Sequence, residues 1–98
     1  MSLEGTWNSQ IASPMGAIEP AFTFTAAGDG LDGVGTMNGE TLPLVHVEQT
    51  GDAASWRMRV SNPIPMTIKF EVVIDGNTLA GTAKPGLMPA AKFTATRV

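Results

Sequence analysis

Apolar and polar residues alternate along short stretches of this chain, and turn-forming residues separate the stretches. Gly, Asp, Asn and Pro recur about every eight to twelve residues, which is typical of short antiparallel strands in an all-β protein. No window carries the apolar spacing of a long amphipathic helix. The alternation predicts about eight strands, over residues 6–12, 18–26, 31–37, 40–47, 53–61, 66–74, 78–83 and 90–98.

The segments between these strands contain residues that tolerate the positive φ of tight hairpin turns. They are Asp29-Gly30, Asn38-Gly39, Gly51-Asp52 and Asp75-Gly76-Asn77. Consecutive strands are therefore expected to pair antiparallel, in an up-and-down meander that closes into a small barrel. Pro20 and Pro43 fall inside predicted strands. Since proline cannot donate to a ladder, each is expected to mark a bulge, a strand start or an edge.

The alternation also assigns each side chain to one of the two faces of its strand. The inward face is predicted to hold Trp7, Ile11, Phe22, Phe24, Leu42, Leu44, Trp56, Met58, Val60, Ile68, Phe70, Val72, Ile74 and Phe93. The solvated face is predicted to hold Asn8, Thr23, Thr25, Arg57, Arg59, Lys69, Glu71, Lys92 and Thr94.

The two halves of the chain also resemble each other at a spacing of 48 or 49 residues. The matched pairs are Trp7 with Trp56, Ile11 with Val60, Pro14 with Pro63, Phe22 with Phe70, Leu31 with Leu79 and Gly33 with Gly81. Four strands from each half cannot bury their apolar face alone, so the halves are expected to close on one another. The alternatives are a pseudo-twofold barrel or sandwich and a chance alignment.

Length and composition predict a single globular domain over residues 1–98, because 43% of the residues are hydrophobic and 15% are charged. We take residues 1–3 as a remnant of cloning and leave them out of the fold. The net charge is −3 and the charges are spread along the chain, which argues against nucleic acid as a partner. We see neither a membrane-spanning run nor an export signal, and we expect a soluble, cytoplasmic protein.

Two short motifs at the ends of the chain carry a family resemblance. Gly5-Thr6-Trp7 opens the first predicted strand, and Arg97 stands next to last in the chain. This arrangement resembles the calycin signature of lipocalins, avidins and fatty-acid-binding proteins. The resemblance implies that Arg97, which shares its parity with Phe93, points inward and lies over the Trp7 ring to close the barrel. The chain also resembles short uncharacterised bacterial domains, some of which are attached to larger enzymes.

The interior of such a barrel is either filled by side chains or holds one small ligand. Gly33, Gly35 and Gly81 add no side chains to the interior, so a small pocket is expected beside them. His46 shares its parity with Leu42 and Leu44 and is expected to point into the same space. A hydrogen-bonded histidine there is one interpretation, and a haem ligand is the other.

The two ends of the meander differ in chemistry, because alternate turns fall at opposite ends. One end collects short polar and acidic turns. The other collects methionine and proline, which are typical of an interface or a ligand mouth rather than of solvated loops. The candidate rim consists of Met15, Met37, Ile64, Met66, Leu87 and Met88. The alternative is that these loops fold over the barrel end and complete its core.

Catalytic chemistry has few candidates in this composition. The chain has one histidine and neither cysteine nor tyrosine, so no His-based triad, two-histidine metal site or thiolate site can form. We therefore expect no cofactor and no metal, and a non-catalytic module that binds a small apolar ligand or a protein surface through the rim. The alternatives are a homodimer or accessory domain of a larger enzyme system, and an enzyme that uses His46 as its base.

Overall fold

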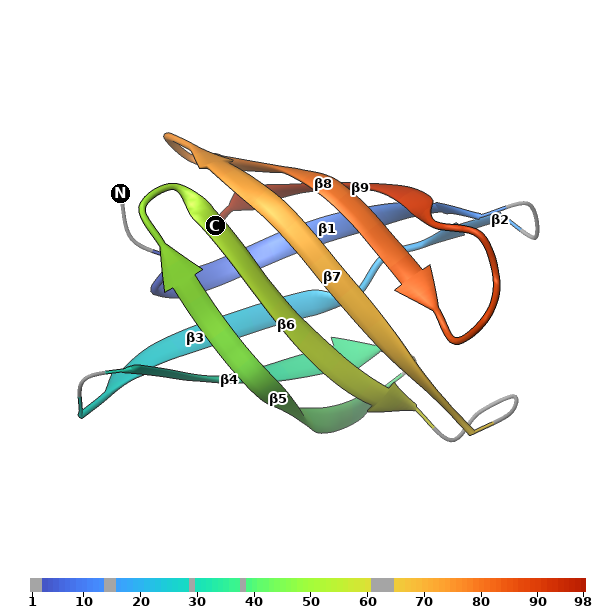
Figure 1. Cartoon of the computed structure of the whole chain (residues 1–98), viewed down its shortest axis with the longest axis horizontal. Coiled ribbons are helices and arrows are strands. Elements are labelled where there is room, and N and C mark those ends of the chain that lie inside the picture. Colours follow the sequence, from blue (N-terminus) through green and yellow to red (C-terminus); the bar gives the residue numbers. More distant parts are fainter. Residues whose placement is uncertain (1–2, 14–15, 29, 38, 61–64) are drawn as a thin grey trace.

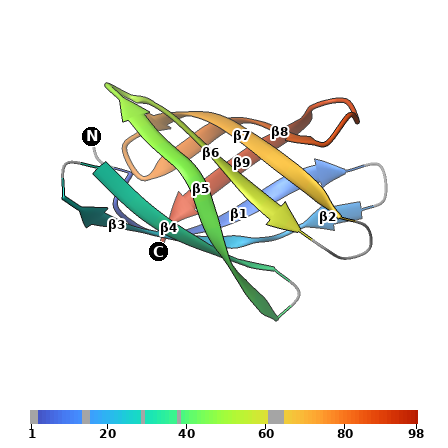
Figure 2. The ribbon, with the colours of Figure 1, turned by 60° about the horizontal axis from the view of Figure 1, so that its bottom comes forward.

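A computed structural model describes residues 3–13, 16–28, 30–37, 39–60 and 65–98, and the regular structure in these ranges is β-strand (Figure 1). The strands are β1 (Gly5–Ser13), β2 (Gly16–Ile18), β3 (Ala21–Ala27), β4 (Gly30–Met37), β5 (Glu40–Thr50), β6 (Ala53–Val60), β7 (Met66–Asp75), β8 (Thr78–Pro85) and β9 (Ala91–Arg97). They form one sheet in the order β2-β1-β3-β4-β5-β6-β7-β8-β9, and β1 also pairs with β9. The predicted all-β meander, closed into a barrel, is confirmed (Figure 2).

The strands β2 and β3 pair one after the other along the same edge of β1. Ile18 pairs with Ile11 and Ala21 pairs with Asn8, so the register continues from β2 to β3 without a shift. Pro20 lies between them, and its carbonyl accepts the backbone N–H of Ser9 at 3.1 Å. Because proline has no N–H to return, the ladder is interrupted at this point. The barrel wall therefore has eight strands, one of which is broken at Pro20.

A β-bulge interrupts the pairing of β5 with β6. Val45 pairs with Arg57 and Glu48 pairs with Ser55, so His46 and Val47 together stand opposite Trp56. His46 adopts a φ of 53°, the left-handed conformation of the first residue in one common class of bulge. The extra residue reverses the parity of the strand, so that Val47 packs against the core and His46 is exposed.

Aromatic rings fill the centre of the barrel. Trp7, Phe22, Phe24, Trp56, Phe70 and Phe93 are all 0% exposed. The Phe22 ring centroid lies 5.3 Å from that of Trp56 and 5.2 Å from that of Phe70, and both contacts are edge-to-face. Such contacts add about 0.5–1.5 kcal/mol each to the gain from burial. The alternation therefore predicted the core correctly at these positions.

The described residues that the internal repeat matches occupy equivalent registers, whereas the matched Pro14 and Pro63 lie outside the described residues. Trp7 pairs with Phe22 between β1 and β3, and Trp56 pairs with Phe70 between β6 and β7. The matched glycines also correspond, because Gly33 pairs with Phe24 in one half and Gly81 pairs with Val72 in the other. The halves differ on the other side of each tryptophan. Trp7 pairs there with Arg97 of β9, whereas Trp56 faces the bulge in β5. A pseudo-twofold axis remains a prediction that these registers favour.

Candidate functional site

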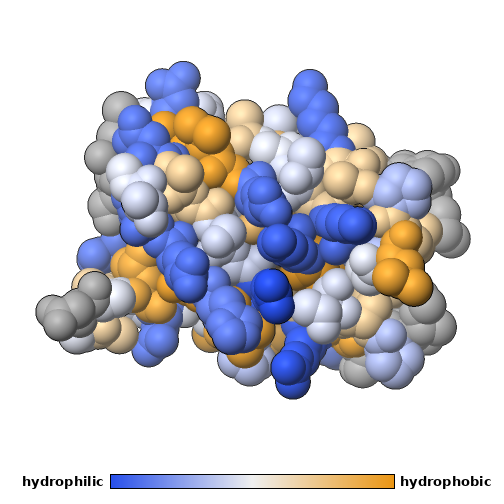
Figure 3. Space-filling view, in the orientation of Figure 1, coloured by the Kyte–Doolittle hydropathy of each residue, from blue (hydrophilic) through white to orange (hydrophobic). Residues whose placement is uncertain are grey.

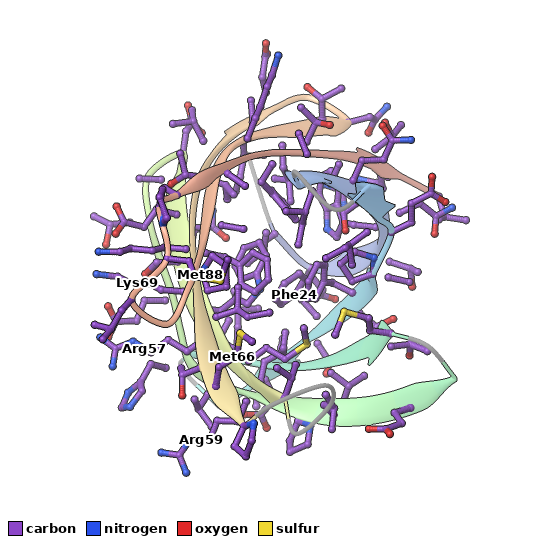
Figure 4. All side chains as sticks on the ribbon, turned by 90° about the vertical axis from the view of Figure 1, so that its right-hand side faces the viewer. Phe24, Arg57, Arg59, Met66, Lys69 and Met88 are labelled. Atoms are coloured by element: carbon purple, nitrogen blue, oxygen red, sulfur yellow. The ribbon has the colours of Figure 1, made fainter. Side chains whose placement is uncertain are left out.

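The rim residues that the structure describes belong to turns and strand ends at one end of the barrel. Met37 ends β4, Met66 begins β7, and Leu87 and Met88 lie between β8 and β9. Figure 4 looks onto this end and shows Met66 and Met88 on the same side of it. Met15 and Ile64 fall outside the described residues.

The turn after β8 presents its apolar residues to solvent. The backbone N–H of Met88 donates to the Pro85 carbonyl at 3.0 Å, which closes a tight turn with Gly86 at a φ of 56°. The N–H of Gly86 in turn donates to the Thr67 carbonyl at 3.0 Å, so β7 anchors the turn. Leu87 is 103% exposed at its tip and Met88 is 50% exposed. The local hydrogen bonds thus hold an apolar pair away from the core.

The other two described methionines of the rim lie deeper. Met37 and Met66 are partly buried and pack against the hydrophobic core. The interpretation that the rim completes the core is supported for this pair, and a binding role of the rim stays a prediction. The strand-end methionines complete the core, and the turn residues Leu87 and Met88 remain available for contact.

Arg97 and Trp7 close the opposite end of the barrel, as expected. The guanidinium carbon lies 4.2 Å from the centre of the Trp7 ring, and Nη1 donates to the carbonyl oxygen of Glu4. Gly5 makes this contact possible, since a Cβ there would lie 2.7 Å from Nη1 and its φ is +127°. The Gly-x-Trp motif therefore has a local reason: the first position must leave room for the cation that covers the third.

Leu3 also closes this end, so our exclusion of residues 1–3 from the fold is wrong at that position. Its side chain is 0% exposed, and its carbonyl accepts the Trp7 indole N–H at 2.8 Å. Its own N–H donates to Oε1 of Gln49 at 2.9 Å. The residue was missed because residues 1–3 were interpreted as a remnant of cloning, although Leu3 shares its parity with Trp7.

The space expected beside the interior glycines is occupied. A Cβ on Gly33 would lie 2.9 Å from both Phe24 and Leu44, and one on Gly35 would lie 2.7 Å from the Met58 sulfur. The rings of β3 thus cover these glycines. At Gly81 a Cβ would lie 1.9 Å from a backbone oxygen of β7, so glycine is needed for close strand approach. Gly33 and Gly35 thus have no open space beside them, whereas Gly81 lines an open groove of about 560 Å³ together with Ser55, Lys69 and Glu71.

His46 does not point into the barrel, and the expectation of an inward imidazole is wrong. The bulge turns its side chain to the outer surface, where it borders a shallow groove of about 260 Å³. Glu48, Ser55, Trp56, Arg57 and Lys69 also line this groove. The parity argument failed because it assumed an uninterrupted strand from Leu42 onward.

The structure also gathers cationic side chains that are spread along the sequence. Arg57, Lys69 and Lys84 are directly opposite one another across β6, β7 and β8. Figure 3 shows strongly hydrophilic side chains over β6 and β7, and Figure 4 shows Arg57, Arg59 and Lys69 pointing away from the barrel. Lys69 forms an ion pair with Glu71 at 3.1 Å. Like charges on directly opposed residues repel each other. The sequence pattern did not predict this cluster, because it depends on the register of the three strands.

Within the described ranges, no group of three or more His, Asp or Glu side chains is placed to hold a metal ion. The same part of the chain contains no helix long and apolar enough to cross a membrane. Comparison with known proteins finds no matching protein family, curated protein or solved structure.

Proposed function

We propose that this protein is a non-catalytic binding module with a calycin-like barrel, and that its rim engages an apolar protein surface. The observation that supports this proposal is the exposed pair Leu87 and Met88, which a hydrogen-bonded turn holds away from the core. An exposed leucine and a flexible methionine suit a surface that adapts to an apolar partner.

The packing of the interior favours a partner on the rim over a ligand inside the barrel. The aromatic side chains and the covered glycines leave the centre occupied. A small apolar ligand would therefore bind across the rim, against Leu87 and Met88, rather than in a cavity of the lipocalin kind. The same rim could instead join two copies of this chain, which is the alternative function.

The placement of His46 favours binding over catalysis. The enzyme alternative uses His46 as its base, but this side chain is exposed at the bulge of β5 and does not belong to the turn that carries Leu87 and Met88. The Trp7–Arg97 contact at the closed end is then a structural element of the calycin-like type.

The double substitution Leu87→Ser/Met88→Ser tests the rim, and Val73→Ser is its matched control. Val73 is 57% exposed on the outer face of β7. When a library of apolar fragments is added, we expect the NMR signals of rim residues to shift in the wild type and in Val73→Ser. The double variant should not show these shifts. Light scattering at increasing concentration tests the dimer in the same samples. Identical behaviour of all three proteins in both measurements would rule out the rim as the binding surface.

A further inference from the structure

The charged residues of this chain are segregated by sign. Residues 1–52 contain seven Asp and Glu and no Lys or Arg, whereas residues 53–98 contain all six Lys and Arg and two Asp and Glu. The net charge is therefore −7 in the first part and +4 in the second, which together give −3. Because the first part forms β1 to β5 and the second forms β6 to β9, one half of the barrel wall is acidic and the other is basic.

Three of the basic side chains form a row across the basic half of the wall. Arg57 of β6 pairs with Lys69 of β7, which pairs with Lys84 of β8, and all three side chains are exposed. Adjacent strands lie about 4.8 Å apart, so the row spans about 10 Å. We call these three residues the cationic row.

The charges within the cationic row are only partly neutralised. Lys69 forms an ion pair with Glu71 at 3.1 Å, whereas Arg57 and Lys84 form no ion pair with any residue that the structure describes. Solvent screens the repulsion of both residues from Lys69 but does not remove it. A carboxylate that lay across the row would therefore meet two cations whose charges are not yet paired.

The cationic row lies between two carboxylates and the apolar turn that follows β8. On one side, Glu48 and Glu71 line an open groove together with Lys69. On the other side, the hydrogen bond from the Gly86 N–H to the Thr67 carbonyl holds the turn against β7, two residues from Lys69. The exposed Leu87 follows Lys84 by three residues. The row and the apolar pair of the turn thus form one continuous surface.

This surface fits a narrow acidic segment better than a broad polyanion. A flat anionic membrane or a nucleic acid backbone would cover Glu48 and Glu71 together with the row, and these carboxylates would repel it. A single extended segment is about one strand wide, so it can follow the row without meeting them. In addition, all six aromatic side chains are buried, so no ring is exposed for a base to stack on.

We propose that the partner of the rim is a protein segment in which Asp or Glu residues adjoin apolar residues. Its carboxylates would lie on the cationic row, and its apolar residues on Leu87 and Met88. Exposed ion pairs contribute little individually, so the row selects the partner and the apolar turn strengthens the binding. This inference rests on the proposed function, because the same turn receives the apolar part of the segment.

The first test compares two capped peptides, Glu-Ser-Glu-Ser-Gly-Leu-Val-Leu and its counterpart with Gln in place of both Glu. In low-salt buffer, we expect the acidic peptide to bind at least about fivefold more tightly, and added salt to reduce this difference. The NMR signals of residues 57, 69 and 84 should shift with the acidic peptide. Equal affinity of the two peptides, or no binding of the acidic one, would overturn the proposal.

The second test reverses one charge of the row. Lys84→Glu places a carboxylate opposite Lys69, which is a favourable pair in the folded barrel. Lys92→Glu makes the same charge change at an exposed lysine of β9, which pairs with Thr82 outside the row. We expect Lys84→Glu to lose about tenfold in affinity for the acidic peptide and Lys92→Glu to lose about twofold. Equal losses would show that only net charge attracts the peptide, and the proposal would then be wrong.

The rim variant Leu87→Ser/Met88→Ser separates this inference from the proposed function. If it binds the acidic peptide as tightly as the wild type while Lys84→Glu does not, the proposed function is wrong and the row is supported. If the rim variant loses binding and Lys84→Glu does not, the rim is supported and the row is wrong. Equally tight binding of a single-stranded DNA oligomer or of phosphatidylserine vesicles, lost in Lys84→Glu, would make the row a general polyanion site and overturn the choice of a protein segment.

Discussion

The two buried tryptophans offer a matched comparison, because one indole N–H has a partner and the other lacks one. Trp7 Nε1 donates to the Leu3 carbonyl at 2.8 Å, whereas Trp56 Nε1 is buried without a hydrogen-bond partner. Both side chains are 0% exposed and both rings lie in the core. Replacing each by phenylalanine removes the same group from two different electrostatic environments.

The expected costs follow from these environments. Trp7→Phe leaves the buried Leu3 carbonyl unpaired, which costs about 1–3 kcal/mol. It also weakens the contact with Arg97 by about 0.5–1 kcal/mol and loses about 1 kcal/mol of packing through the smaller ring. Trp56→Phe loses similar packing, but it removes a desolvated donor whose burial costs about 1–3 kcal/mol. We therefore expect Trp7→Phe to lose about 2.5–5 kcal/mol, and Trp56→Phe to range from unchanged to about 2 kcal/mol more stable.

Urea unfolding followed by far-UV circular dichroism measures both variants without relying on tryptophan fluorescence. In thermal melts, a difference of at least about 2.5 kcal/mol should separate their midpoints by roughly 10 °C or more. If Trp56→Phe loses as much stability as Trp7→Phe, then the Trp56 indole has a partner, such as the face of a neighbouring ring, and the reasoning is refuted.

Two further substitutions test the backbone of the barrel by chemical denaturation. His46→Gly should leave the free energy of unfolding unchanged or raise it by up to about 1 kcal/mol, because relief of the left-handed conformation exceeds the entropy cost of glycine; a clear loss of stability would contradict the strained bulge. Gly81→Ala should cost about 3 kcal/mol or more, because its Cβ would lie 1.9 Å from the Glu71 carbonyl oxygen. The control Gly28→Ala, with nothing within 4 Å of its Cβ and a φ of +58°, should cost only about 1–2 kcal/mol, so equal losses would argue against a steric origin.

Most of the fold was predictable because turn residues and alternation agree along the chain. The hairpin at Gly51-Asp52 and the strand of Trp56 that follows it each have a strong local signal. Pro20 was correctly expected to disturb its strand, since its missing N–H acts in any ladder. Such features depend on neighbours in sequence, so they can be inferred before the strands are assembled.

The errors arose where a distant contact or a single inserted residue decides the structure. The bulge residue with a positive φ is His46 and not a glycine, so the sequence did not indicate a bulge there. Parity therefore placed the imidazole on the wrong face. The burial of Leu3 depends on Trp7 and on Gln49, which lies far along the chain. Likewise, the meander predicted that the rim turns lie at one end, but it could not predict the hydrogen bond from the Met88 N–H to the Pro85 carbonyl that shapes the exposed turn.

The pairing of β1 with β9 bears on how this protein is made. Trp7 pairs with Arg97, so β1 can pair with β9 only after residues as far as 97 have left the ribosome. Until then the nascent chain has two open edges, at β1 and at the most recently formed strand, and both can pair with other chains. Closure is therefore a late event that joins distant residues, and translation arrest before β9 would leave a curled sheet exposed to aggregation.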